Sequence, residues 1–508
     1  MTRNSLERRK VFLGRLASLS AIAFVVALVL LSAACNNVNL AGEERGSGTV
    51  SLAIDEVLAS EIRSAIPAHL RSTTGDNSTY TLTASIRGDY SDGKTEFATE
   101  ASLSGVTFTF ERIPTGKNII LDVTVKVGDN TIWYGNSGKH MVVSGINKLN
   151  VAVGRVSGVL LWKRNVDSGN HDILTAPYGA YDSPAEMGIT FGASDSSQGT
   201  PFCFDGDGNL YVMSSDAQSP LEVQKYDLQP DGTYADMKTN IPTNSQAAFN
   251  HLAYDSVADV LYGIVKNDAL KCFKTNSQGF DQVQGYTVNS GSYLGLAAYD
   301  NVVYTAQTGL NEGENGEIMV SLSRYDLSSG ESSKLGETIQ HQLPPVFGTE
   351  VSALTGHMIY QDGALYLSIG RLEIVLDESS GAGIAGYSIG AVVKINAATL
   401  AIEEGFGQNG YLGLLDSSEG INGKACFAPT AKNEGACFYG PMGFVAVMPK
   451  KLVIADSGLA MSANGTTNVK LSKKSRIVTI DLETEAFESV PMDGYYEPTY
   501  STGCGFVN

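Results

Sequence analysis

The chain has 508 residues. Because single hydrophobic cores stop growing at about 250–300 residues, we expect at least two domains. Its 35 Lys and Arg residues against 54 Asp and Glu residues give a net charge of −19. This balance argues against a nucleic-acid partner, since phosphate binding needs a concentrated basic face. The 55 glycines, 43% hydrophobic residues and 18% charged residues exclude a largely disordered chain and favour a β-rich protein with many tight turns.

Residues 1–34 have the layout of an export signal. Five basic residues precede an uncharged and largely apolar stretch, Leu16–Ala34, which ends directly before Cys35. A basic region, an apolar region and small residues in this order are typical of a signal peptide. An uncleaved transmembrane anchor remains an alternative, because about 20 apolar residues suffice to span a bilayer. A cleaved soluble secretory signal is the third alternative, and all three export the rest of the chain.

The segment Leu31-Ser32-Ala33-Ala34-Cys35 resembles the cleavage site of bacterial, spirochaete-like lipoproteins. In that family Leu and then small residues precede the Cys, and here Ser32 stands where Leu is usual. The resemblance implies that Cys35 carries palmitate-like acyl chains and anchors the protein to a membrane of the cell envelope, with the lipid bilayer as its partner. Residues 35–48 would then be the lipidated cysteine and a flexible tether, because they lack apolar periodicity.

Residues 49–155 alternate between apolar and polar side chains. The clearest run is Ile119–Val127, where every second residue is Ile, Leu or Val, which predicts a strand buried on one face. We expect the other face, with Asp122, to lie toward solvent, and a short helix over Glu56–Leu70. The whole region predicts an Ig-like or transthyretin-like β-sandwich. The seven expected strands are Val50–Ile54, Tyr80–Ile86, Val106–Phe110, Ile119–Val127, Thr131–Tyr134, Met141–Val143 and Leu149–Val153.

Residues 156–508 contain a repeated pattern of a strand, a polar turn, a second strand and a third apolar run. The equivalent positions of the second strand are separated by 51, 42, 62 and 87 residues. A repeat of about 40–50 residues with four strands indicates a β-propeller, and the longer separations indicate loop insertions. The equivalent positions are Tyr211, Tyr262, Tyr304, Tyr366 and Val453, and the third runs are Val223–Leu228, Leu270–Phe273, Leu322–Leu327, Val392–Asn396 and Ile477–Leu482.

Part of this region resembles NHL-repeat propellers, in which a glycine-rich turn leads into an LYVADSG-like strand and then an arginine-bearing strand. The matching residues are Phe406–Gly410, Leu452–Gly458 and Arg476-Ile477. Together with the repeat, the resemblance favours six blades, with five or seven as alternatives. The sixth blade would join Ser157–Arg164 to the C-terminal Thr499–Val507, because closing the ring removes exposed sheet edges.

One turn has the spacing of a calcium loop. Asp205, Asp207 and Asn209 place three oxygen-bearing side chains two residues apart, as at the start of an EF-hand loop. The favoured interpretation is a hairpin turn, because a strand-like run follows where an EF-hand needs a helix. Calcium is therefore a weak cofactor candidate, and no other cofactor is indicated.

The spacing of the cysteines favours a disulfide over a metal site. Cys426 and Cys437 flank a ten-residue loop and are the candidate disulfide. No C-x-x-C pair occurs, which disfavours a zinc site. Cys504 could also meet Cys203. The six histidines form no metal-binding motif and are interpreted as surface or core residues: His69, His140, His171, His251, His341 and His357.

No catalytic motif stands out, since phosphate loops, nucleophile elbows and sialidase-like boxes are not evident. We therefore expect a non-catalytic binding or scaffold module for a protein or glycan partner, with the contacts on loops held by a rigid scaffold. The segments Thr308–Met319 and Glu403–Pro441 are the candidate contact loops. The alternative is a lactonase-like hydrolase or lyase that holds a divalent metal in the propeller channel.

Overall fold

The computed structural model describes residues 47–53, 80–88, 97–101 and 107–164 and, with short gaps, residues 171–414 and 438–492. These residues form β-strands joined by turns, with one short 3-10 turn at Pro345–Phe347 and no α-helix among them. The protein is therefore all-β, as expected. In the same residues no helix is long and apolar enough to cross a membrane. Glu56–Leu70, where we expect a helix, lies outside the described residues.

The first domain, residues 47–155, contains two sheets. In one sheet, β1 (Ser47–Ala53) lies between antiparallel β4 (Thr107–Pro114) and parallel β8 (Gly145–Leu149). The other sheet has the order β3-β2-β5-β6-β9, with β7 paired to β5. Its strands are β2 (Tyr80–Gly88), β3 (Phe97–Ala101), β5 (Asn118–Val127), β6 (Asn130–Asn136), β7 (His140–Met141) and β9 (Gly154–Arg155).

One hydrophobic core joins these two sheets. Alternate residues of β1, β2, β4 and β5 are buried in it, as the period of two predicts. The strands differ from expectation in several places. β1 spans Ser47–Ala53 rather than Val50–Ile54, and β3 and β9 were not predicted. The run expected over Leu149–Val153 is not one strand, since β8 ends at Leu149.

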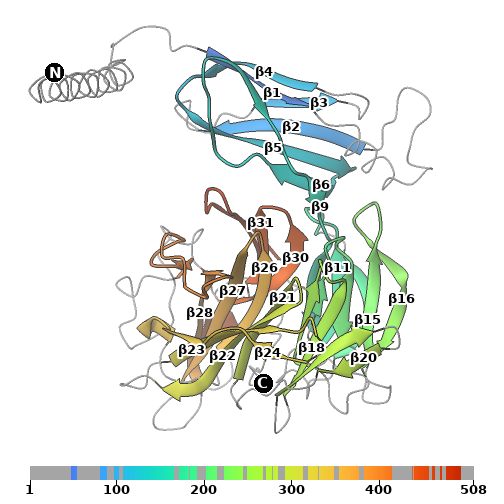
Figure 1. Ribbon diagram of the computed structural model, residues 1–508, viewed down its shortest axis with the longest axis vertical. Coiled ribbons are helices and arrows are strands. Elements are labelled where there is room, and N and C mark those ends of the chain that lie inside the picture. Colours follow the sequence, from blue (N-terminus) through green and yellow to red (C-terminus); the bar gives the residue numbers. More distant parts are fainter. Residues whose placement is uncertain are drawn as a thin grey trace, which may run out of the picture.

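Six further sheets, counted over the described residues 159–491, follow in chain order (Figure 1). We number them sheet I to sheet VI. Sheet I contains β10 (Val159–Arg164), β11 (His171–Ala176) and β12 (Ala185–Phe191). Sheet II contains β13 (Phe202–Phe204), β14 (Leu210–Met213), β15 (Glu222–Leu228) and β16 (Tyr234–Pro242). Sheet III contains β17 (His251–Asp255), β18 (Val260–Lys266), β19 (Leu270–Asn276) and β20 (Gly279–Gln282).

The remaining three sheets are larger or more irregular. Sheet IV contains β21 (Ser292–Tyr299), β22 (Val302–Glu312), β23 (Ile318–Asp326), β24 (Ser333–Lys334) and β25 (Ile339–Gln342). Sheet V contains β26 (Leu354–Gln361), β27 (Ala364–Leu376), β28 (Gly383–Asn396) and β29 (Tyr411–Leu412), and it is extended by β32 (Ala460–Ala463) and β33 (Val469–Leu471). Sheet VI contains β30 (Pro441–Met448), β31 (Lys451–Asp456), β34 (Arg476–Asp481) and β35 (Phe487–Pro491).

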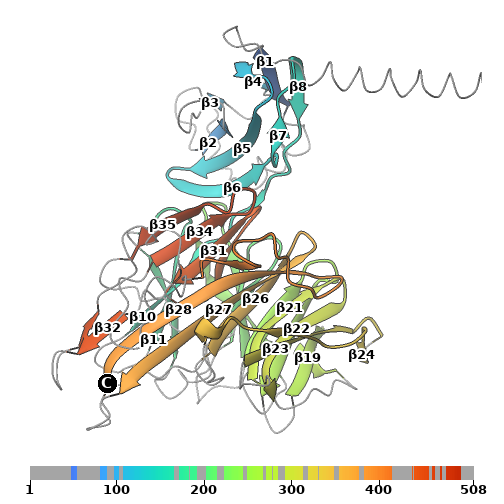
Figure 2. The same ribbon diagram turned by 90° about the vertical axis from the view of Figure 1, so that its left-hand side faces the viewer.

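The six sheets form a ring. The first strands of sheets II to VI contact one another in order, and β30 of sheet VI contacts β10 of sheet I. The hydrophobic clusters lie between neighbouring sheets, and one of the two largest joins sheets VI, I and II. Figures 1 and 2 show the sheets around one axis, with the first domain stacked on one end of the ring. This arrangement is compatible with a β-propeller.

The sequence repeat matches the sheets. Its five equivalent positions lie in the second strands of sheets II to VI, which are β14, β18, β22, β27 and β31. The third apolar runs coincide with β15, β19, β23, β28 and β34. The residues that resemble NHL repeats are also placed together: Asp456 at the end of β31 accepts a hydrogen bond from Nε of Arg476, at the start of β34, at 2.8 Å.

Sheet I differs from the other five sheets in strand direction. The first strands of sheets II to VI all run toward the first domain. Residues at their C-terminal ends line a cavity together with residues 152–155 of that domain. The chain enters β10 from the same end of the ring, and Ser157 N donates to the carbonyl of Val447 at 3.0 Å. β10 therefore runs opposite to the other innermost strands. Thr499–Val507, expected to complete this sheet, lies outside the described residues.

One of the two expected contact loops is partly strand, and most of the other lies outside the described residues. Much of Thr308–Met319 is strand, because β22 continues to Glu312 and β23 begins at Ile318. In Glu403–Pro441, the described part includes a turn that leads into β29, whereas residues 415–437, which include Cys426 and Cys437, lie outside the described residues.

A charge network fixes the first domain on the ring. Arg87 of β2 donates to Asp122 Oδ2 at 2.5 Å and to Asp481 Oδ2 of sheet VI at 2.6 Å, and the Tyr134 hydroxyl donates to Asp122 Oδ1 at 2.6 Å. Burial alone would lower the pKa of Arg87, but Asp122 and Asp481 outweigh it and raise this pKa. The expectation that Asp122 faces solvent is wrong, because Asp122 is buried beneath Arg87 and Tyr134.

Candidate functional site

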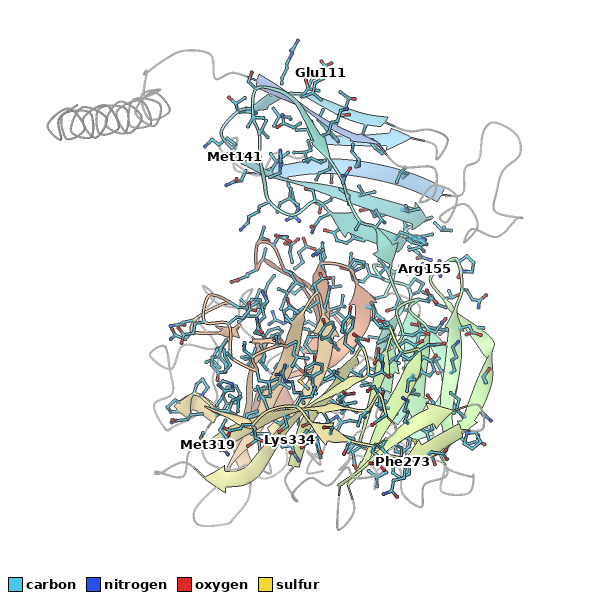
Figure 3. All side chains as sticks on the ribbon, in the orientation of Figure 1. Glu111, Met141, Arg155, Phe273, Met319 and Lys334 are labelled. Atoms are coloured by element: carbon cyan, nitrogen blue, oxygen red, sulfur yellow. The ribbon has the colours of Figure 1, made fainter. Side chains whose placement is uncertain are left out.

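A cavity of about 410 Å³ lies where the ring axis meets the first domain. The last residues of β13, β17, β21, β26 and β30 line it, and residues 152–155 of the first domain run along its edge. Arg155, labelled in Figure 3, marks this junction. The lining is mostly apolar, for instance Leu252, Ala297 and Met358, with polar groups at the mouth. Such a lining is typical of sites for small organic groups.

Stacked tyrosines surround the mouth of the cavity. Tyr360 stacks on Tyr299 with ring centroids 4.1 Å apart, which joins sheets IV and V. Tyr254 stacks on Tyr211 at 5.6 Å, which joins sheets II and III. Tyr254 and Tyr360 both line the cavity and are partly exposed. Each therefore combines an apolar ring face with a hydroxyl group at the mouth.

The turns that hold these tyrosines are fixed by a buried aspartate. Asp255, fully buried, follows Tyr254 and accepts hydrogen bonds from the Asp300 and Asn301 amides, at 2.9 and 2.6 Å. It therefore links the turn of sheet III to that of sheet IV. Asn301 has φ of 60°, a backbone region that Asn tolerates better than most residues. These two hydrogen bonds hold the turns of sheets III and IV together at the mouth of the cavity.

The floor of the cavity is a cluster of rings on the axis. His357 of sheet V has its ring 5.0 Å from Phe202 of sheet II and 5.8 Å from Phe444 of sheet VI. Its Nδ1 accepts a hydrogen bond from the Phe444 amide at 3.0 Å, so the imidazole is neutral with the proton on Nε2. Burial, and then the nearby His251, lower the pKa of His357 to about 3. Burial lowers the pKa of His251 to about 4.

Asp362 and Lys450, two of the charged residues that line the cavity, are paired with each other. The Asp362 carboxylate accepts from Lys450 Nζ at 2.8 Å, and the Tyr254 hydroxyl donates to Asp259. Burial, followed by the hydrogen bond to Asp259, raises the pKa of Tyr254, so this hydroxyl stays protonated and cannot serve as a base at neutral pH. Lys451 lies over the Tyr134 ring at 4.7 Å.

The Asp205–Asn209 segment forms a tight turn beside this cavity. Asp205 Oδ1 accepts from the amides of Asp207 and Asn209 at 3.0 and 2.9 Å, and Oδ2 accepts from the Asn209 side chain at 2.8 Å. The Asn209 side-chain oxygen in turn accepts from the Leu228 amide at 2.8 Å. These oxygens close the turn. Over the described ranges, no group of three or more His, Cys, Asp or Glu residues is placed to hold a metal ion.

Most other predicted site residues cannot be placed. Cys203 is a free, buried thiol that lines the cavity, and burial raises its pKa, so it is protonated and unreactive. Cys35, Cys426, Cys437 and Cys504 lie outside the described residues. The lipidation and the disulfide therefore stay predictions.

Sequence reasoning missed the stacked tyrosines at the mouth and the place of His357 on the floor of the cavity. An aromatic residue followed directly by Asp ends the first strand in three successive repeats, at Phe204-Asp205, Tyr254-Asp255 and Tyr299-Asp300. That recurrence could have revealed the rim. No local signal marks His357, because its partners Phe202 and Phe444 are distant in sequence.

Comparison with known proteins leaves the family open. Residues 374–500 match the family model of the TdpA C-terminal domain, which covers less than half of the chain. No curated protein matches the chain.

Solved structures resemble the chain only distantly. A protein of unknown function from Bacteroides thetaiotaomicron is 12% identical, with 75% of this chain and 87% of that chain covered and a TM-score of 0.29. A putative 6-phosphogluconolactonase from Bacteroides uniformis is 12% identical, with 64% and 94% covered and a TM-score of 0.26. AztD from Citrobacter koseri is 11% identical, with 67% and 96% covered and a TM-score of 0.27. Resemblance at this level carries no argument about function.

Proposed function

We propose that this chain is an exported lipoprotein, anchored to a cell-envelope membrane by acyl chains on Cys35, whose ring binds a protein or glycan ligand at the cavity without converting it. One observation carries the binding role. Among the described residues that line the cavity, Asp362 is the sole carboxylic acid, and Lys450 already neutralises it. General acid–base hydrolysis of glycosides needs two such groups on either side of the bond. A shaped, aromatic site without this pair supports binding.

The dimensions of the site favour a small ligand group. Ligand pockets commonly measure about 300–1,000 Å³, and this cavity of about 410 Å³ is near the lower end. Tyr254 and Tyr360 offer ring faces for the apolar face of a sugar or for an apolar side chain. The open side of the cavity would admit one residue of a longer chain.

The proposal extends to the architecture. We assign the first domain as an Ig-like or transthyretin-like sandwich and the ring as a six-bladed, NHL-like propeller. Thr499–Val507 would supply the innermost strand of sheet I. The direction of β10 supports this closure: it runs like the second strand of a blade, and among the described residues it pairs with β11 alone. Thr499–Val507 would therefore take the position of the first strand in sheet I, next to β10.

A glycan array with a peptide array beside it tests the binding role. Tyr360→Ala should remove most binding to any ligand that wild type retains. Phe487→Ala, which truncates a partly buried ring on the outer strand β35 of sheet VI, should leave binding unchanged and serves as the matched control. Equal binding by wild type and Tyr360→Ala would refute this site. Turnover of a bound ligand, or a stoichiometric divalent ion required for it, would favour the hydrolase or lyase instead.

A further inference from the structure

Three exposed hydrophobic side chains gather at one corner of the first domain. Met141, Val143 and Ile146 are 58%, 57% and 70% exposed. Over the described residues, they are the three most exposed large hydrophobic side chains, and they fall within six positions of the sequence. Figure 3 shows Met141 at the outer edge of the first domain. We call these three residues the apolar corner. Such clusters mark contact surfaces more often than isolated exposed residues do.

The apolar corner is held rigidly. Asn147, which is buried, accepts from the Val143 amide at 3.0 Å and donates to the Val143 carbonyl at 2.9 Å. Its side chain also donates to the Thr49 carbonyl of β1 at 3.2 Å. Val142, between the two exposed residues, is buried in the core of the domain. The exposed side chains are therefore presented by an anchored turn.

The chain from Cys35 arrives beside this corner. Gly48 and Thr49 of β1 pair directly with Gly145 and Ile146. A Cβ at Gly48 would lie 2.5 Å from the Val143 carbonyl, which shows how closely β1 approaches the turn. The segment between Cys35 and Ser47 has eleven residues, and a flexible chain of that length spans roughly 18 Å on average. An anchor at Cys35 would therefore hold the apolar corner at about this average distance from the bilayer.

The local charge has the opposite sign to the whole chain. Residues 139–148 contain Lys139 and Lys148 and no acidic residue, whereas the net charge of the chain is −19. Both lysines are exposed, and Lys117 is adjacent, since its carbonyl accepts from the Val142 amide at 2.9 Å. Apolar side chains flanked by lysines suit the interface of an anionic bilayer, where the ammonium groups meet lipid phosphates.

We propose that Met141, Val143 and Ile146 insert into the interface of the bilayer that carries the Cys35 anchor. This inference depends on the lipid anchor of the proposed function. The acyl chains would hold the protein at the membrane, and the apolar corner would set its orientation. The Arg87 network makes the first domain and the ring one unit, so that orientation would extend to the ring and its cavity.

A fluorescence experiment on the mature lipidated protein tests the insertion. The protein is purified from membranes, reconstituted into phosphatidylglycerol vesicles and floated on a gradient. Ile146→Trp adds a probe at the corner, and brominated acyl chains should quench its emission at least about twofold if it lies in the interface. Val257→Trp is the matched control, because Val257 is similarly exposed, at 55%, but lies in the turn between β17 and β18 of the ring. Its emission should not change beyond the background of Trp133 and Trp162.

The outcomes separate the two proposals. Protein that does not float lacks the anchor, and the proposed function and this inference then fail together. Protein that floats with both probes unquenched keeps the anchor and overturns the insertion. Adding Met141→Glu and Val143→Glu to the Ile146→Trp variant should abolish quenching, and persistent quenching would also overturn it. A dimer that these two Glu substitutions dissociate would instead assign the apolar corner to a second copy of this chain.

Discussion

The first domain and the ring bury their hydrophobic residues in different ways. The first domain has one core cluster that joins its two sheets. The described part of the ring has five, and each bridges neighbouring sheets. The two sheets of the first domain bury their apolar faces against each other, whereas a sheet of the ring buries both of its faces only when both neighbouring sheets are present. The ring therefore depends on closure, and closure in turn leaves a central axis where a cavity can form.

Removing residues 493–508 should give the largest effect. If Thr499–Val507 closes sheet I, its loss exposes β10 and the cluster that joins sheets VI, I and II. We expect the melting temperature of the ring to fall by on the order of 10 °C, with the first domain affected less. Scanning calorimetry would measure both transitions. Deleting Asn508 alone is the control, and an unchanged ring transition in the longer deletion would contradict closure by this segment.

Arg87→Met would probe the junction between the two regions. It leaves Asp122 and Asp481 without their shared cation at a mostly buried interface, so we expect a loss of about 1–3 kcal/mol in the free energy of unfolding. The unfolding transitions of the two regions should also separate in urea. Lys394→Met, which removes the exposed pair with Glu403, should cost less than about 0.5 kcal/mol. Equal losses in both variants would argue against the network.

The two buried histidines near the ring axis, His251 and His357, predict that the stability of the ring depends on pH. His251 and His357 have pKa values lowered from 6.5 to about 4 and about 3, so the unfolded chain binds protons that the folded ring does not. The free energy of unfolding should have its full value above pH 6.5. It should fall as the pH drops toward 4 and then 3, by on the order of a few kcal/mol.

His357→Leu tests this pH dependence in urea unfolding at pH 7 and pH 4.5. The variant should lose roughly 1–3 kcal/mol at pH 7, because the Phe444 amide loses its acceptor. Its stability should nevertheless change less between the two pH values than that of wild type. Met358→Leu, at the next buried position, should keep the full pH dependence. An unchanged slope in His357→Leu would exclude this residue as the cause.

Calcium should have the smallest effect. The oxygens of Asp205 and Asn209 already accept hydrogen bonds that close their turn. Millimolar calcium should therefore shift the melting temperature by less than about 1 °C, since a ligand stabilises only by binding the folded state. A shift of several degrees, lost in Asp207→Asn and reversed by a chelator, would establish a calcium site there.

The repeat could be read from the sequence because its signal is local. Tyr211, Tyr262 and Tyr304 each occupy the second strand of a sheet, where period-two burial and polar turns recur. Strand direction in sheet I was not predictable, since it depends on which end of the ring the chain enters. Asp122 was misplaced for a related reason: its alternation with apolar neighbours indicates a polar face, but Arg87 and Tyr134, which cover it, come from other strands.

The amino-acid sequence alone was enough for the all-β class, the positions of the repeated strands and the acidic, glycine-rich character of the chain, because propensity, period and composition act over a few neighbouring residues. The tertiary structure decided the cavity, its floor and the junction with the first domain. His357, Phe202 and Phe444 come from three sheets, and Arg87 meets Asp481 across 394 positions. Such contacts exist only after the ring has closed, so no local pattern in the chain encodes them.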